Sequence, residues 1–157
     1  MSNLQSTFKS IISTRKSVAF ILGRTPLELL NTIPNGQNNN IVWNAGHIIA
    51  VQQLLVNRKS GYQYTEDKLI TQNFRPGTAP EGVYDQAIVD HLKERLLSNA
   101  IDMEKTFLDG LYGAYDPFTT RTKIELTSVE DAINFELMHS GLHLGYIMSY
   151  LNVLAKK

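Results

Sequence analysis

Three histidines have the residue type and the spacing to share one metal ion. His139 and His143 lie four residues apart in a stretch with helical periodicity, so both imidazole rings project from one side of the predicted helix. One cation that accepts both lone pairs would satisfy two desolvated rings better than two unrelated hydrogen bonds would. Such pairs also arise by chance on surface helices, and that alternative stays open at this point.

The third histidine, His47, belongs to a different predicted helix. It shares a helix face with Trp43, Ala50, Val51 and Leu54, so its ring points along an apolar stripe toward the core. Taken alone, this position predicts a buried, neutral, hydrogen-bonded histidine rather than a metal ligand.

The residues around the pair do not include the general base of a zinc peptidase. The two histidines are separated by Ser140, Gly141 and Leu142, so the motif is not H-E-x-x-H. The nearest acid is Glu136, three residues before His139. It could lie behind a metal ligand, act as a weak fourth ligand or be solvated, and we favour the solvated side chain.

Three other polar side chains bear on the site. Asn44 precedes His47 by three residues and could line a pocket or orient a ligand, although a polar residue near a helix cap is the simpler explanation. Tyr146 follows His143 by three residues and could contact a substrate, but we favour an aromatic core residue with a satisfied hydroxyl. His91 lies on the polar side of another predicted helix, so we expect a surface histidine outside the site.

Composition excludes several other chemistries. The chain has no cysteine, which excludes disulfides, thiolate metal sites and a cysteine nucleophile. Ser140 lacks a G-x-S-x-G setting, and no glycine-rich phosphate loop occurs. Fifteen basic and fifteen acidic residues give no net charge, so we expect no binding to nucleic acid or to an anionic membrane.

Length and hydropathy predict one domain in the cytoplasm. The 157 residues are close to the usual size of a single domain, and we expect one domain over residues 1–157. The first ten residues lack a charged start followed by an apolar run, and no window approaches eighteen uninterrupted apolar residues. We therefore expect a cytoplasmic protein.

Helical periodicity accounts for most of the chain. Apolar residues recur at three- and four-residue steps, and no segment alternates convincingly with period two. Pro26 opens a short helix after the first long one, and a capping box at Thr127–Glu130 opens the last. Residues 62–82 have no sustained hydrophobic period, which predicts a long loop, and we expect this loop to cover a functional part of the protein. The long helices are expected at residues 3–22, 41–59, 85–111 and 128–154.

The predicted architecture is therefore all-α: a four-helix bundle with a short extra helix between its first two long helices. The second long helix is apolar on most of its circumference, so it should lie at the centre of the bundle.

Several sequence motifs, in their order along the chain, resemble those of the DinB-like (DinB/YfiT) superfamily of proposed metal-dependent enzymes. The motifs are NIVWNAGHI at residues 40–48, FRPGTAP at 74–80, SVEDA at 128–132 and HSGLHLGY at 139–146. The resemblance spans nearly the whole chain. It implies a four-helix bundle in which His47, His139 and His143 hold a divalent metal. Tyr146 departs from many members, which have glutamine or another polar residue there, and this departure bears on substrate identity.

The ligand type narrows the chemistry that the resemblance implies. Three neutral imidazoles with open coordination positions suit Zn or Ni, with Fe or Cu as alternatives. Such a metal can activate bound water for hydrolysis or bind a thiol as thiolate, so relatives look like hydrolases or like transferases that use low-molecular-weight thiols. We expect a small-molecule substrate, and the resemblance also implies a homodimer.

Two hypotheses in which the protein is not an enzyme remain open. The same bundle could bind a metal or a small ligand without turnover, since no obvious general base accompanies the histidines. Alternatively, all three histidines could be core residues, in which case His47→Ala would leave the metal content unchanged.

Overall fold

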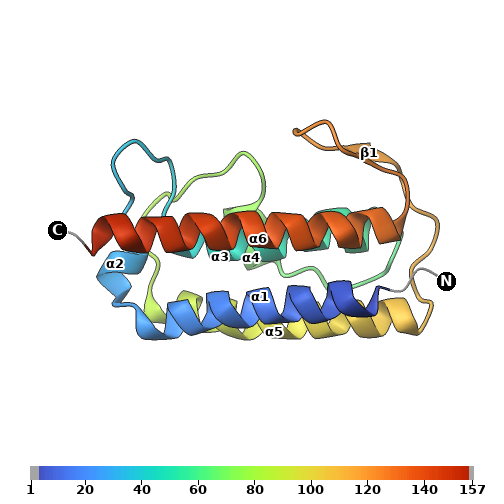
Figure 1. Ribbon diagram of the computed structural model, residues 1–157, viewed down its shortest axis with the longest axis horizontal. Helices are drawn as coiled ribbons and strands as arrows, with labels where there is room; N and C mark the ends of the chain where they lie inside the picture. The colour runs from blue at the N-terminus through green and yellow to red at the C-terminus, as the bar shows by residue number, and fades with distance from the viewer. Residues whose placement is uncertain (1–3, 156–157) are drawn as a thin grey trace.

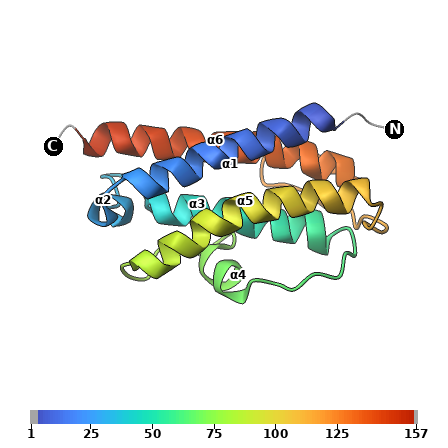
Figure 2. The ribbon, with the colours of Figure 1, turned by 90° about the horizontal axis from the view of Figure 1, so that it is seen from below.

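The computed structural model describes residues 4–155, and four long helices dominate it. The long helices are α1 (Gln5–Arg24), α3 (Ile41–Gln52), α5 (Gln86–Leu108) and α6 (Val129–Leu154). Each packs against two neighbours, in the ring order α1, α5, α3, α6. Helices α1 and α6 run in one direction and α3 and α5 in the other (Figures 1 and 2). The all-α four-helix bundle is confirmed; residue 3, where the first helix was expected to begin, lies outside the described residues.

Short elements complete the bundle. Helix α2 (Leu27–Asn31) is the expected short helix between the first two long ones. The second long helix continues beyond α3 as a π-helical segment, η1 (Gln53–Arg58). Among residues 4–155, no helix combines the length and the apolar character that crossing a membrane requires.

Two regions outside the expected helices contain short elements. The predicted loop at 62–82 includes helix α4 (Lys68–Phe74), because the Asp67 carboxylate accepts a hydrogen bond from the Ile70 amide and Phe74 is fully buried. Strands β1 (Phe118–Thr119) and β2 (Glu125–Leu126) form a small antiparallel ladder, with Phe118 opposite Leu126. Neither element is long enough for its periodicity to stand out in the sequence.

Helix α3 lies at the centre of the bundle, as its apolar circumference predicts. Every residue from Ile41 to Gln52 is buried. The side chain of Asn40 caps the helix by accepting a hydrogen bond from the Trp43 amide. A Cβ atom at Gly46 would overlap the ring of Phe74, so this glycine lets α4 approach α3 closely.

Helix α6 begins with a capping box that lies one residue later than predicted. Ser128 accepts a hydrogen bond from the Asp131 amide, and the Asp131 carboxylate accepts one from the Ser128 amide. The predicted pair was Thr127 with Glu130. Asp131 takes the acidic position because its carboxylate also accepts hydrogen bonds from the amide and hydroxyl of Thr127. This cap fixes the start of the helix that carries two of the three histidines.

Candidate metal centre

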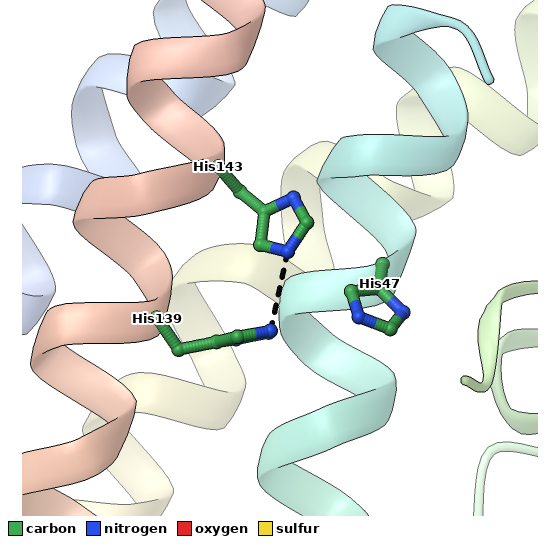
Figure 3. Close-up of side chains that lie close together, drawn as sticks. All are labelled: His47, His139 and His143. Carbon is green, nitrogen blue, oxygen red and sulfur yellow. Dashed lines mark hydrogen bonds between the residues drawn. The ribbon is translucent and has the colours of Figure 1, made fainter. Parts of the chain in front are cut away.

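The structure brings the three predicted histidines together. His47 comes from α3, and His139 and His143 come from α6; the three rings converge in the space between the two helices (Figure 3). One ring nitrogen from each residue lies within 4.8 Å of the other two, and all three residues are buried. His91 lies elsewhere, with its Nε2 hydrogen-bonded to the Asp67 carboxylate at 2.7 Å, so it is outside this cluster as expected.

Hydrogen bonds fix the tautomer of His47. Its Nδ1 lies 2.7 Å from the carbonyl oxygen of Phe74, the last residue of α4. A carbonyl oxygen only accepts hydrogen bonds, so Nδ1 carries the proton and Nε2 presents its lone pair. Metal-binding histidines are typically held in this way, with the second ring nitrogen bonded to a carbonyl or a carboxylate.

Asn44 fixes His143 by the same principle. Its amide nitrogen donates to the Asn40 carbonyl at 2.8 Å, which leaves its Oδ1 to accept from Nδ1 of His143 at 2.7 Å. His143 therefore also presents the lone pair of Nε2. Asn44 therefore has two roles: it contacts the start of α3, as a polar residue near the helix cap, and it orients a histidine from a distant part of the chain.

His139 completes the cluster and has an unsatisfied atom. Its Nε2 lies 3.2 Å from Nε2 of His143, while its Nδ1 is buried without a hydrogen-bond partner. Since His143 offers a lone pair there, His139 must either donate a proton to it or share a cation with it. With a shared cation, the proton of His139 moves to Nδ1, on the side of the ring that faces Glu136 at 3.9 Å. The donor set thus fits a divalent cation.

Glu136 is buried, so the expectation of a solvated side chain is wrong. Its Oε1 accepts hydrogen bonds from Nη2 of Arg15 at 2.7 Å and from the hydroxyl of Ser140 at 2.8 Å. The carboxylate faces Nδ1 of His139, the nitrogen on the far side of the ring from Nε2. Glu136 therefore lies behind a candidate ligand and is not placed as a fourth one.

Arg15 was missed in the sequence, although a signal was present. It occupies the buried stripe of α1 between Ile11 and Val18, where an apolar residue is expected. A guanidinium in such a position requires a buried acid as its partner. The stripe therefore indicates a buried carboxylate on another helix, but it does not say which one.

Burial keeps the three histidines neutral. Desolvation, together with the neighbouring imidazoles, lowers the pKa of His139 to about 2 and that of His143 to about 3. Desolvation also lowers the pKa of His47. Burial raises the pKa of Glu136, and Arg15 and Ser140 oppose that rise. Neutral imidazole is the form that binds a metal, so the cluster is ready for a cation at neutral pH.

Aromatic residues and the segment after α4 enclose the cluster. The ring of Trp43 stacks on His47 with 4.5 Å between centroids, and its Nε1 donates to the Thr78 hydroxyl at 3.0 Å. The segment at 62–82 thus lies over α3, beside the histidines, as expected. The sequence placed Trp43 on the same helix face as His47, but it identified neither the bond of Trp43 to Thr78 nor that of His47 to the Phe74 carbonyl, because both depend on how the segment at 62–82 packs.

Tyr146 is exposed, so the expectation of a core aromatic residue is wrong. Its side chain is 44% exposed, and its ring centroid lies 6.1 Å from that of His143. Its side chain therefore reaches solvent near the ring of His143.

Comparison with protein families places the chain in a known group. A family model described as the DinB superfamily matches residues 11–147. No curated protein matches the chain. The matched range includes the three histidines as well as the residues that orient them.

Proposed function

The chain belongs to the DinB superfamily, and from this premise we propose that it is a metal-dependent enzyme whose divalent cation, Zn or Ni, is held by His47, His139 and His143. The observation that carries the proposal is the convergence of three buried, neutral imidazoles, two of which have Nδ1 tied to an oxygen acceptor. Three protein ligands with an open position are typical of catalytic metal sites.

A cation held in this way supplies a Lewis acid, which suits either hydrolysis of a small molecule or transfer of a low-molecular-weight thiol. The protein's own residues have separate tasks. The Phe74 carbonyl and Asn44 hold two rings in orientation. The Glu136 carboxylate, 3.9 Å from Nδ1 of His139, electrostatically favours a proton on that nitrogen. Arg15 in turn holds Glu136 in place.

The proposal extends to partners and location. The substrate is a small molecule that meets Tyr146 on its way to the cluster, and the absence of net charge argues against nucleic acid. The homodimer and the cytoplasmic location remain predictions. Sedimentation of the purified chain tests the first, and imaging of the tagged chain in its native cell tests the second.

A binding protein without turnover is the second candidate. It is favoured by the state of Glu136, the acid nearest to the three histidines in sequence, whose Oε1 is already engaged by Arg15 and Ser140. A carboxylate restrained in this way is poorly placed to abstract a proton from a substrate.

Metal content tests the proposed site directly. We would measure it by plasma mass spectrometry on untagged protein, for the wild type, His47→Ala, His143→Ala and the control His91→Ala. We expect about one Zn or Ni per chain in the wild type and the control, and loss of the metal in the two cluster variants. No metal after incubation with both ions would overturn the proposal.

Turnover separates the enzyme from the binding protein. Metal-loaded protein would be screened against esters and amides, and against electrophiles together with thiol cosubstrates. Activity that disappears in His143→Ala and persists in His91→Ala supports the enzyme. Full metal occupancy without turnover in any of these assays favours the binding protein.

A further inference from the structure

A cavity lies apart from the three histidines, beside the π-helical segment. It has a volume of about 490 Å³ and is formed by η1, the connection that follows it and α5. None of the three histidines lines it. π-Helical turns are uncommon and occur frequently at functional sites. The lining side chains that matter here are Gln52, Gln53, Tyr64, Arg95, Asn99 and Asp102.

Three amide atoms in this wall are buried without a hydrogen-bond partner. They are Oε1 of Gln52, Oε1 of Gln53 and Nδ2 of Asn99, and the three residues are between 1% and 5% exposed. The Gln52 amide is already anchored, because its Nε2 donates to the Asn99 carbonyl at 2.9 Å. Buried polar groups are nearly always paired, and here three unpaired amide atoms belong to residues that line one cavity, which points to a ligand as their partner.

The basic side chains of the wall are already neutralised. Arg95 lies 3.4 Å from the Asp67 carboxylate, and Lys105 forms an ion pair with Asp109. Neither cation is free to attract an anionic ligand such as a phosphate or a carboxylate. The unpaired groups are three amides and Nε of Arg95, and Asp67 balances the charge of that guanidinium. Hydrogen-bonding groups without a net charge recognise neutral polar molecules.

The pattern of unpaired atoms matches hydroxyl groups. The two glutamine oxygens need donors and the Asn99 nitrogen needs an acceptor, and a hydroxyl both donates and accepts. Tyr64 lines the same cavity, and its hydroxyl donates to the Gln53 carbonyl at 3.2 Å, which ties the connection to η1. The volume lies within the range of small-molecule sites.

We propose that this cavity binds a small neutral molecule with several hydroxyl groups, such as a monosaccharide or a cyclic polyol. Gln52 and Gln53 accept hydrogen bonds from it, and Asn99 donates one. This site is independent of the proposed metal centre, so its occupancy does not require His47.

Two probes, glucose and myo-inositol, test the proposal on the full chain. Each would be titrated to millimolar concentration while the side-chain amide signals of Gln52, Gln53 and Asn99 are followed by NMR. We expect at least one probe to shift these signals saturably. His47→Ala should bind that probe as the wild type does, which separates this site from the metal centre.

Matched variants locate the binding. Gln53→Met and Asn99→Leu keep the approximate side-chain size and remove an unpaired atom, so we expect probe affinity to fall by roughly tenfold or more. Gln72→Met makes the same kind of change on the exposed face of α4 and should leave affinity unchanged. Circular dichroism verifies that each variant is folded.

Two results would overturn the proposal. One is the absence of a saturable shift with both probes in the wild type, a result that does not depend on any variant folding. The other is equal affinity in the wild type, Gln53→Met and Asn99→Leu.

Discussion

Asn44 connects the two helices of the candidate metal centre through a single hydrogen bond to His143. We predict that Asn44→Leu weakens zinc binding by about 10- to 100-fold, because Nδ1 of His143 loses its acceptor and the ring is free to rotate. Competition titration against a zinc chelator of known affinity measures the change.

Asn44 also contacts the start of α3, so a control is needed. Asn44→Asp keeps the oxygen that faces His143 and loses the amide donors to Asn39 and Asn40. Zinc affinity close to that of the wild type in Asn44→Asp attributes the effect to His143. An equal loss in both variants would contradict the orienting role and point to the helix cap instead.

Arg15 and Glu136 form a buried ion pair behind His139. We predict that Arg15→Met lowers the free energy of unfolding by about 3–5 kcal/mol, because it leaves the Glu136 carboxylate buried without its cation. Urea denaturation measures the loss.

Removing both partners should cost less than removing Arg15 alone. The double variant Arg15→Met, Glu136→Leu contains no uncompensated charge at this place, so we expect it to regain part of the lost stability. If the two single substitutions are simply additive, the pair is not energetically coupled and the role assigned to it here is wrong.

Residue identity alone predicts part of the site. The spacing of His139 and His143 places both rings on one side of a helix, and the resemblance adds His47. Glu136 could not be assigned from its own neighbourhood, because its cation lies on α1, far away in sequence. The exposure of Tyr146 could not be predicted from the sequence either, since it depends on which face of α6 meets the bundle.

At the scale of elements, the close approach of α4 to α3 positions His47. We predict that Gly46→Ala destabilises the protein by about 1–3 kcal/mol, because its Cβ would overlap the ring of Phe74. The displacement also moves the Phe74 carbonyl, so zinc affinity should fall as well. Thermal unfolding and chelator competition measure the two effects.

Gly145→Ala is the matched control on α6. A Cβ atom there meets no atom within 4 Å, so we expect unchanged zinc affinity and a gain in stability of up to about 1 kcal/mol from the better helix former. If Gly46→Ala binds zinc as tightly as Gly145→Ala does, α4 does not position the histidine.

Long elements were predictable and short ones were not. The four long helices bury enough apolar residues for their period to be evident in the sequence. Helix α4 spans only Lys68–Phe74, and its burial comes from contact with α3 rather than from a sustained pattern of its own. The π-helical segment Gln53–Arg58 continues the apolar run of α3, so its change of helical pitch could not be predicted from residue composition.

At the scale of the whole molecule, the bundle keeps three imidazoles neutral inside its core, and this makes the metal-free protein sensitive to acid. The folded-state pKa values of His139 and His143 are about 2 and about 3, and that of His47 is also lowered from 6.5. Below pH 6.5 the unfolded chain therefore binds more protons than the folded one, and stability falls as the pH falls. Burial shifts Glu136 in the opposite sense, but it is one group against three.

Each of the three clustered histidines should contribute about 1.4 kcal/mol of lost stability per pH unit below 6.5, down to its folded-state pKa. Urea denaturation of the metal-free protein at pH 7 and pH 5.5 measures the effect. His139→Leu removes one of the three contributions, so its stability should change less between the two pH values than that of the wild type. Equal stability of the wild type at both values would mean that the rings take up protons in the folded state, which contradicts the desolvation of this cluster.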